Sequence, residues 1–408
     1  MAHQNRSQPV KRHCMVVHAY YPLGETRVER EALALIDRGY AVDVVCLQDA
    51  GEPAQESVDG VTVYRLPVQR GKRRGQVFQL FEYLAFFVLA SIKLIGLHWR
   101  NRYGVIQAHN LPDFLVFAAI GPKLLGARVI LDLHDLMPEF YAARGNRSMT
   151  SWPVRLVIWQ EQISCRFADH VITVTDIWRE TLIRRGVPAG KVSVVMNVAD
   201  TRIFQRSLVD EPSLSRNGSF RLIYHGTLTH RYGVDLILRA LAQVRSAVPG
   251  IRLTLIGAGD ALDDLQRLAE ELGLGEQVEF SRELHAAHLP PLIAQADAGV
   301  VPNRNDPFTD TLLPTKLLEY VALGTPVIAA RTQTIAAYFD DSMVKFFRPG
   351  DADDLANAIL DLHTDRSLLV RLARNAGKFD EKYSWPQVSA QYAALVDRLN
   401  SRQTMRKP

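Results

Sequence analysis

The feature that most constrains the fold of this chain is a regular alternation between short apolar runs and segments with helical periodicity. In the first half, apolar runs rich in Val, Ile and Leu cover residues 14–18, 42–47, 61–65, 105–108, 129–132, 171–174 and 192–196. Strands that alternate with helices favour right-handed crossover connections and a mostly parallel sheet. Runs that are apolar at nearly every position are typical of strands covered on both faces. The pattern therefore predicts an α/β fold with doubly wound sheets.

A polar segment over residues 197–219 interrupts this alternation. It contains Pro212 and Gly218, which favour irregular chain, so we interpret it as a linker. The alternation then restarts, with apolar runs at residues 222–225, 252–256, 278–280, 299–301, 326–329 and 344–347. We expect Rossmann-like domains over 1–200 and 219–380, a linker over 201–218, and a C-terminal helix within 381–408 that packs back on the first domain. Two such domains facing each other across a cleft make a natural ligand site.

Composition excludes several classes of protein. The 408 residues are 47% hydrophobic and 23% charged, which indicates a globular chain long enough for two or three domains. A net charge of +4 spread over this length argues against a nucleic-acid-binding protein. The three cysteines have no paired spacing, so we expect no disulfides, no cysteine metal site and a reducing compartment. The residues before His13 are polar, without the apolar run of a signal peptide, and we expect a cytoplasmic protein.

One segment raises the question of a membrane. Residues 83–97 are the most apolar stretch, but Lys93 lies inside it and Glu82 just before it. This is shorter than the roughly 20 uncharged residues of a spanning helix, so the segment is either a buried helix or one that lies on a bilayer surface. A basic cluster precedes it, formed by Arg70, Lys72, Arg73 and Arg74. The cluster is either a solvated loop or a contact with an anionic membrane on its inner face.

Chemistry is expected where parallel strands end, because ligands bind outside their carboxyl ends. In the first half, the loops at residues 19–25, 109–113 and 134–139 should line one rim of the sheet. Gly24 lets a backbone approach a ligand closely, or simply makes a turn. Titratable side chains follow two neighbouring strands: His109, Asp113, His134 and Asp135. Such a concentration favours a functional site, although helix capping by the two aspartates remains open.

The second half has a sharper pattern in residues 313–328, which reads as loop, helix, turn and strand. Pro314 suits a helix start, and Lys316 and Glu319 lie three residues apart near that start. A cation beside free helix N–H groups suits a diphosphate, and a nearby carboxylate can accept hydrogen bonds from ribose hydroxyls. The alternative is an exposed ion pair along the helix.

Two further loops of the second half are candidates. Arg231, in the loop after the first strand, either clamps phosphate or is a surface arginine. The Gly257-Ala-Gly259 turn after the second strand resembles half of a dinucleotide fingerprint but lacks the third glycine, so it is weak support for NAD.

Together these residues resemble a known family. Residues 225–330 resemble the donor domain of glycosyltransferase family 4, which has the GT-B fold. The matching pieces in this sequence are His225-Gly226-Thr227-Leu228, Arg231-Tyr-Gly-Val-Asp235, Ile256-Gly-Ala-Gly-Asp260, Ala296-Asp297, Pro314-Thr-Lys316 and Glu319-Tyr-Val-Ala-Leu-Gly-Thr-Pro-Val-Ile328. In the first half the matching pieces are Tyr21-Pro22, Arg38-Gly-Tyr-Ala-Val42, His109 and His134-Asp135.

The resemblance implies a retaining transfer of sugar from a nucleotide-sugar to a glycan or polyprenyl-linked acceptor, with no metal. It makes the first domain acceptor-binding and the second nucleotide-sugar-binding. It implies that Glu319 binds the donor ribose and that Lys316 and Arg231 hold the diphosphate in place of a metal. Gly24 would add backbone contacts, and His109 would contact the donor sugar near the reacting carbon.

Other roles follow from the same resemblance. On the donor side it implies Gly226, Thr227, Leu284, Leu313 and Thr315. Asp113, His134 and Asp135 are acceptor-side candidates. The only Asp-x-Asp run, at 351–353, precedes a helix and is interpreted as a cap, so no metal is expected.

The chain departs from the family pattern at a few positions. A second glutamate, eight positions before the ribose-binding one, is replaced by Thr311, with Asp310 beside it. The usual Arg and Lys of the first donor-domain loop fall at Thr227 and Tyr232. Three alternatives stay open from the sequence: a nucleotide-sugar epimerase of the same architecture, an NAD-dependent oxidoreductase, and a non-catalytic nucleotide-sugar-binding protein.

Overall fold

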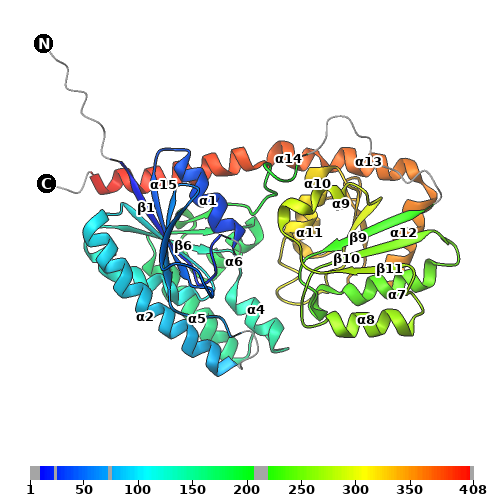
Figure 1. The fold of residues 1–408 in the computed structure, drawn as a ribbon, viewed down its shortest axis with the longest axis horizontal. Coiled ribbons are helices and arrows are strands. Elements are labelled where there is room, and N and C mark those ends of the chain that lie inside the picture. The colour runs from blue at the N-terminus through cyan, green and yellow to red at the C-terminus, as the bar shows by residue number, and fades with distance from the viewer. Residues whose placement is uncertain (1–9, 23–24, 72–75, 206–218, 405–408) are drawn as a thin grey trace, which may run out of the picture. The chain divides into compact units, whose positions relative to one another are not determined.

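The computed structural model describes residues 10–22, 25–71, 76–205 and 219–404, and Figure 1 shows its fold. The chain forms two compact units. Unit 1 comprises residues 1–197 and 386–408, and unit 2 comprises residues 198–385.

Unit 1 is built on an eight-stranded sheet with the order β3-β4-β2-β1-β5-β6-β7-β8. Its strands are β1 Arg12–Val16, β2 Ala41–Leu47, β3 Gln55–Val58, β4 Val61–Leu66, β5 Val105–His109, β6 Arg128–Leu133, β7 His170–Thr173 and β8 Val192–Val194. Every neighbouring pair is parallel except β3 with β4. The apolar pattern did not reveal β3, whose Gln-Glu-Ser-Val sequence suits its exposed place at the sheet edge.

The helices of unit 1 connect and cover these strands. They are α1 Thr26–Ile36, α2 Gln76–Asn101, η1 Asp113–Ala119, α3 Ile120–Leu124, α4 Met137–Arg144, α5 Trp152–Phe167, α6 Asp176–Arg184, η2 Ala189–Lys191 and, from the end of the chain, α15 Trp385–Thr404. Tyr392 of α15 is fully buried, and its hydroxyl donates to Gln107 Oε1 of β5 at 2.7 Å. Asp397 Oδ1 accepts from Tyr40 Oη at 2.7 Å. The C-terminal helix is therefore part of unit 1.

Unit 2 has a six-stranded, fully parallel sheet with the order β11-β10-β9-β12-β13-β14. Its strands are β9 Phe220–His225, β10 Ile251–Ile256, β11 Val278–Ser281, β12 Ala298–Val301, β13 Val327–Ala330 and β14 Lys345–Phe347. Its helices are η3 His230–Tyr232, α7 Val234–Val244, α8 Leu262–Glu271, η4 Ala286–His288, α9 Pro290–Ile293, α10 Thr315–Leu323, α11 Gln333–Tyr338, α12 Ala352–Thr364, α13 Arg366–Ala376 and α14 Lys378–Lys382. Numbered within the unit, the strand order is 3-2-1-4-5-6, the order of doubly wound nucleotide-binding folds.

Each sheet has a point where its strand order reverses, between β1 and β5 in unit 1 and between β9 and β12 in unit 2. Ligands of open parallel sheets bind in the crevice at this point, outside the carboxyl ends of the strands. The predicted fold class, two doubly wound Rossmann-like units, is confirmed. Most of the linker predicted over 201–218 lies outside the described residues.

The buried Tyr392 hydroxyl provides a test of how α15 is held. We expect Tyr392→Phe to lower the free energy of unfolding of unit 1 by about 1–2 kcal/mol, because Gln107 Oε1 then loses its donor inside the protein. Urea denaturation followed by fluorescence measures the change. Tyr141→Phe is the matched control, since no hydrogen bond of its hydroxyl occurs within the described part of the chain. Equal losses in both variants would contradict the role of this bond.

Candidate functional site

The first group of candidate residues lies at the start of α10 in unit 2. Pro314 precedes the helix, which begins at Thr315 and follows the loop after β12. Lys316 is 8% exposed, and its Nζ lies between two rings, 4.8 Å from the centroid of Tyr224 and 4.9 Å from that of Tyr232. An ammonium over aromatic faces gains some electrostatic stabilisation, but less than from a carboxylate partner.

Lys316 has no ion-pair partner within the residues that the structure describes. Its predicted alternative role, an exposed ion pair with Glu319 along the helix, is therefore wrong, because the lysine is buried and no carboxylate oxygen lies within 4.0 Å of Nζ. Burial lowers the pKa of Lys316 to about 8, and attraction by Glu319 only partly offsets this effect. A buried ammonium without a counter-ion, at the first turn of a helix, is a favourable place for an anion.

The loop after β9 makes room for this lysine. Gly226 has a φ of +116°, a backbone conformation that favours glycine. A Cβ at this position would lie 3.1 Å from Lys316 Cε. The glycine predicted from the strand exit is therefore explained by the close approach of the lysine side chain.

Glu319 lies one turn further along α10. Its side chain is 18% exposed, and its Oε2 lies 3.3 Å from Nε2 of His225, the last residue of β9. Burial, and then the charge of Lys316, lower the pKa of His225 to about 3, so its imidazole is neutral at physiological pH. One carboxylate is thus held beside a neutral ring and remains partly accessible.

Tyr320 anchors α10 to the sheet at the reversal point. Its hydroxyl donates to Ile223 O and accepts from His225 N, both at 3.3 Å, and it is fully buried. The ring lies against Gly299 of β12, where a Cβ would come within 2.4 Å of it. Lys316 and Glu319 therefore project from a helix whose position is set by packing on β9 and β12.

Arg231 lies in η3, on the same loop as Tyr232. Its guanidinium carbon is 5.7 Å from the ring centroid of Phe308, and it is partly exposed. The loop is held by Arg304, which donates to Asp235 at 2.8 and 2.6 Å and to His230 O at 3.1 Å. The sequence alone did not single out Arg304, because nothing in its spacing links it to Asp235.

The Gly-Ala-Gly turn after β10 has a packing explanation. A Cβ at Gly259 would lie 1.9 Å from Leu228 O, so this glycine is needed for contact between two loops of unit 2. The structure thereby removes the main support for a dinucleotide fingerprint.

The remaining donor-side candidates lie in the same loops. Thr227 is exposed beside Gly226, and its carbonyl accepts from Tyr224 Oη at 2.8 Å. Leu313 is buried and Thr315 is exposed, on either side of Pro314. Leu284 lies in the loop after β11 and is partly exposed.

Thr311, which replaces the second glutamate of the family pattern, and its neighbour Asp310 both form hydrogen bonds with nearby backbone. Asp310 Oδ1 accepts from Gln333 N at 2.8 Å, which ties it to α11. Thr311 Oγ1 donates to carbonyls of its own turn, Phe308 O at 3.2 Å and Pro307 O at 3.3 Å.

Asn303, two residues after β12, was missed by the sequence reasoning. It is fully buried, and neither its Oδ1 nor its Nδ2 has a hydrogen-bond partner among the described residues. Buried amides without partners are costly, so this group marks a place where a ligand or water completes the structure. Asparagine in a polar loop is common, which is why no sequence signal distinguished it.

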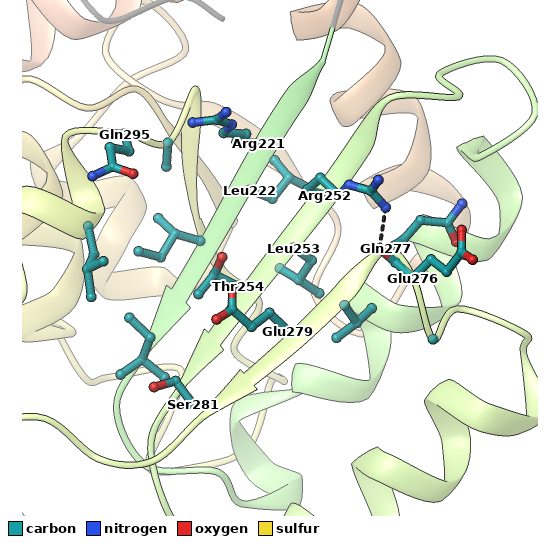
Figure 2. A pocket seen from close by; sticks show the side chains of 16 residues that line it. Arg221, Leu222, Arg252, Leu253, Thr254, Glu276, Gln277, Glu279, Ser281 and Gln295 are labelled. Carbon is teal, nitrogen blue, oxygen red and sulfur yellow. Dashed lines mark hydrogen bonds between the residues drawn. The ribbon is translucent and has the colours of Figure 1, made fainter.

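A hollow of about 660 Å³ lies over β9, β10 and β11. Figure 2 shows Thr254 and Glu279 near its middle and Ser281 at the end toward which the strands point. Arg221 and Arg252 are exposed between buried neighbours there, and Glu279 is exposed between half-buried ones. The hollow differs from the Lys316 site but reaches Ser281, at the start of the loop that carries Leu284.

The second group of candidates lies in unit 1, around Asp132 near the end of β6. Arg27 donates to both of its oxygens, from Nε at 2.9 Å and from Nη2 at 3.1 Å. His109 Nδ1 lies 3.0 Å from Asp132 Oδ2. The other ring nitrogen of His109, Nε2, is buried and has no hydrogen-bond partner among the described residues. The Asp132 carboxylate thus lies beside Nδ1 and orients the imidazole, and Nε2 remains available for a hydrogen bond.

Charges in this cluster are unequal. Burial alone would raise the pKa of Asp132, but Arg27 and His109 lower it below its ordinary value. Burial raises the pKa of Glu31, which lies 3.0 Å from Arg27 and accepts from Gln107 Nε2 at 2.6 Å. Burial lowers the pKa of His109. The Arg27 guanidinium therefore lies beside two carboxyl groups, Glu31 and Asp132, and Asp132 is the one that carries the negative charge.

The acceptor-side candidates adjoin this cluster. His134 Nδ1 lies 4.0 Å from Asp132, and its ring centroid is 6.2 Å from that of His109. Asp113 is fully buried, accepts from Asn110 Nδ2 at 2.9 Å, and has its pKa raised by burial to about 7. The carbonyl of Asp135 accepts from Asn110 Nδ2 at 2.5 Å. Neither aspartate is the cap residue of the adjacent helix, which argues against the capping alternative.

A second hollow, of about 480 Å³, lies in unit 1 and was not predicted from the sequence. It is lined by residues after β2 and β4: Gln48, Asp49, Ala50, Gly51, Pro67 and Gln69. It lies at the carboxyl ends of these strands, where ligands of parallel sheets bind. No motif in the sequence distinguishes these residues.

Some predicted residues cannot be placed. Gly24, Lys72, Arg73 and Arg74 lie outside the described residues. Arg70 is described, and its Nη2 donates to His18 O at 3.1 Å while its backbone N donates to Tyr20 Oη at 3.1 Å.

Comparison with known protein families identifies the class of this protein. Residues 24–197 match the family described as glycosyl transferase 4-like domain, and residues 206–379 match the family described as glycosyl transferases group 1. Two doubly wound units with these matches define a glycosyltransferase of the GT-B class. The chain belongs to the group 1 glycosyltransferases, family 4, and is a hexosyltransferase-type enzyme. The oxidoreductase alternative is thereby excluded.

Curated relatives agree with this class. The chain is 26% identical over 381 residues to a D-inositol 3-phosphate glycosyltransferase of Stackebrandtia nassauensis, covering 88% of this chain and 82% of the relative. It is 32% identical over 174 residues to a GDP-mannose-dependent alpha-(1-6)-phosphatidylinositol monomannoside mannosyltransferase of Mycolicibacterium smegmatis, covering 41% and 45%.

Solved structures show the same fold. Sucrose-phosphate synthase from Thermosynechococcus elongatus matches with a TM-score of 0.78 at 19% identity, over 96% of this chain and 100% of the other. An Anabaena protein solved with UDP-glucose matches with a TM-score of 0.71 at 18% identity, over 95% and 99%. At these identities the likeness establishes the fold alone.

The buried charge of Lys316 gives a prediction about stability. Since the folded pKa is about 8 instead of 10.5, the unfolded chain binds more protons between these pH values. The full cost of burial is present below pH 8 and is lost as the pH rises toward 10.5. We therefore expect Lys316→Met to raise the free energy of unfolding at pH 7 by about 1–3 kcal/mol, and less at pH 10.

Urea denaturation at the two pH values measures this difference. The control is Lys378→Met, which changes an exposed lysine of the same unit. A Lys316→Met protein that is less stable than the wild type at pH 7 would show that the ammonium has a partner and is not an unsatisfied charge.

Proposed function

We propose that this enzyme transfers a hexosyl residue, with retention of anomeric configuration, from a nucleoside-diphosphate sugar to a hydroxyl of a glycan or lipid-linked glycan. The bond between the anomeric carbon and the donor phosphate oxygen breaks, and a bond from that carbon to the acceptor oxygen forms. The acceptor proton leaves with the phosphate, so the products are a glycoside and a nucleoside diphosphate.

The observation that carries the proposal is the unpaired, buried ammonium of Lys316 at the start of α10. A diphosphate supplies the negative charge that this position lacks, and free N–H groups at the helix start add to the attraction. During transfer, negative charge grows on the leaving phosphate, and a fixed cation there stabilises the transition state more than the ground state. We assign a supporting role to the Arg231 guanidinium.

Glu319 is proposed to bind the ribose of the donor. Its carboxylate is held near His225 and keeps 18% of its side-chain surface accessible, so it can accept from two neighbouring hydroxyls. Gly226, Thr227, Leu313 and Thr315 lie in the loops next to it and are proposed to contribute backbone contacts, while Leu284 faces the base.

His109 is proposed to contact the donor sugar through Nε2. Its Nδ1 faces Asp132, which orients the ring, and its lowered pKa keeps it neutral at physiological pH. A neutral imidazole in this orientation offers one hydrogen bond without placing a second cation beside Arg27. Asp113, His134 and Asp135 are proposed to face the acceptor.

We propose that the reaction needs no metal. The ligand atoms of His109, Asp132 and His134 lie within 4.8 Å of one another, close enough to be considered as a metal site. Both oxygens of Asp132 already accept from Arg27, however, and a divalent cation there would lie beside a guanidinium. The positive charge for the phosphate comes from side chains in this proposal.

The activities of relatives support the proposed classes of donor and acceptor. One relative is GDP-mannose-dependent and acts on a phosphatidylinositol mannoside, and one structural neighbour was solved with UDP-glucose. We propose a nucleotide-sugar donor on this basis, a lipid-linked glycan as the acceptor, and a role in polysaccharide or glycoconjugate synthesis. We also propose a cytoplasmic location, where the three buried free cysteines remain reduced.

Donor binding provides the first test. We expect Glu319→Ala to weaken binding of the preferred nucleotide by about 1–3 kcal/mol, because the ribose hydroxyls lose their acceptor. Thermal shifts with UDP, GDP, ADP and their sugar conjugates, without added metal, measure this, since a ligand that binds only the folded state raises the melting temperature. Glu271→Ala, at an exposed position in α8, is the control. Unchanged affinity in Glu319→Ala would remove this residue from the site.

Product analysis provides the second test. With donor and acceptor glycan present, we expect NMR to show a glycoside with the anomeric configuration of the donor, formed equally well in EDTA. Activity that disappears in EDTA and returns with a divalent metal would contradict the metal-free proposal. Isomerised donor formed without any acceptor would indicate an epimerase, and binding without turnover would indicate a sensor.

A further inference from the structure

Exposed apolar side chains are concentrated on one part of unit 1. Among the described residues, fifteen large hydrophobic side chains are exposed, and fourteen of them lie on α2, α3, the residue after α3, and α5. On α2 they are Phe78, Leu80, Phe81, Leu84, Val88, Ile92, Ile95 and Trp99. The others are Ile120, Leu124, Leu125, Trp152, Leu156 and Trp159. A monomeric soluble protein rarely leaves so many large apolar groups together in water.

Helix α2 is apolar on two opposite sides. Phe86, Ala90 and Leu94 are fully buried and recur every four residues, on the side that packs on unit 1. The exposed side chains from Phe81 to Trp99 recur at intervals of three and four residues, which places them on the other side of the helix. Packing within unit 1 buries the first stripe, whereas most of the second stripe stays exposed in the described structure, with only Ile95 also lying against α3.

The three helices form one surface. The short helix η1 contacts both α2 and α5, with Phe87 and Phe114 rings 5.9 Å apart and Phe117 and Phe167 rings 5.0 Å apart. Helix α3 lies against α2 so closely that a Cβ at Gly121 would come within 2.5 Å of Ile95. In Figure 1, α2 and α5 run along the same side of unit 1. We name this area the α2–α5 surface.

Charge on the α2–α5 surface has one sign. The acids within α2, α3 and α5 are Glu82 and Glu161, and both are buried. The exposed charged residues of these helices are Arg100, Arg155 and Arg166, and none of them has an ion pair among the described residues. Three of the five tryptophans of the chain, Trp99, Trp152 and Trp159, are also exposed here. Apolar, aromatic and basic side chains together match the interfacial region of an anionic bilayer.

We propose that the α2–α5 surface binds peripherally to an anionic lipid bilayer, with its apolar side chains inserted among the headgroups and its arginines on lipid phosphates. The proposal does not depend on the transfer reaction.

Two other arrangements fit the observations less well. The segment from Phe78 to Asn101 is long and apolar enough to cross a membrane, and 28% of its apolar 18-residue window is buried. One whole stripe of α2 packs on unit 1, however, so the helix cannot be surrounded by lipid without leaving the fold. A second copy docked on this surface would bring arginines of the two copies toward one another, which disfavours self-association.

Vesicle flotation of the purified full chain tests the proposal. We expect the protein to float with vesicles of phosphatidylcholine mixed with phosphatidylglycerol, and to float less with phosphatidylcholine alone or at high salt. Tryptophan emission should shift to shorter wavelength on binding and be quenched by lipids with brominated acyl chains. A chain that stays with the soluble fraction under all these conditions would overturn the proposal.

Two double variants separate the apolar and the electrostatic contributions. Phe81→Gln with Ile92→Gln should lower partitioning into anionic vesicles at least about tenfold, because two exposed apolar side chains no longer insert. Arg100→Gln with Arg155→Gln should lower it by up to about 30-fold at low salt, since each arginine near an anionic surface contributes roughly fivefold.

The matched control is Arg267→Gln with Arg371→Gln, which removes the same charge from exposed helices of unit 2. Equal losses in this control and in the arginine variant would show a nonspecific charge effect and overturn the proposal. All variants change exposed residues, and circular dichroism checks that each folds.

Light scattering without lipid distinguishes the bilayer from a second copy. We expect wild type and Phe81→Gln/Ile92→Gln to have the same mass in solution. A wild-type dimer that this variant converts to a monomer would identify the surface as an interface between copies and would overturn the membrane proposal.

Discussion

A cation held out of water needs negative charge nearby, and the two units meet this need in opposite ways. In unit 1 the buried guanidinium of Arg27 donates to both oxygens of Asp132, which in turn faces His109. Among the described residues of unit 2, the buried ammonium of Lys316 faces two tyrosine rings and a more distant carboxylate, without an ion-pair partner. In the first arrangement the cation is paired, and its carboxylate partner also lies beside a histidine. The second is incomplete, and incompleteness of this kind is typical of binding sites, where stability is given up for affinity.

Both arrangements lie where the strand order of a parallel sheet reverses. At the reversal, the chain leaves two neighbouring strands in opposite directions. The loops that follow these strands carry the polar side chains. Packing then decides where these side chains lie. Tyr320 bonds to β9 and contacts β12 at Gly299, so α10 has one position, and Lys316 and Glu319 share it. The family pattern and the candidate site of unit 2 coincide, because α10 carries both the matching sequence motif and the buried Lys316 ammonium.

The α2–α5 surface is independent of this site. Its apolar side chains are exposed, whereas the opposite stripe of α2 is buried in unit 1. The proposed bilayer contact and the proposed lipid-linked acceptor are compatible with each other, but they rest on different residues.

The sequence by itself determined the fold class, because apolar runs with two different periodicities leave few alternatives to two parallel sheets. It also indicated Lys316, Glu319 and His109, since residues at strand ends meet at one edge of a sheet. Tertiary structure decided what no spacing reveals: that Lys316 is buried, that Asp132 lies beside His109, and which side of α2 is exposed. It also decided that, within the part of the chain that the structure describes, Lys316 has no ion pair and the Asn303 amide no hydrogen-bond partner. These properties depend on contacts between residues far apart in the chain. Burial sets the pKa of a charge and the cost of an unpaired amide, and burial exists only once the chain has folded.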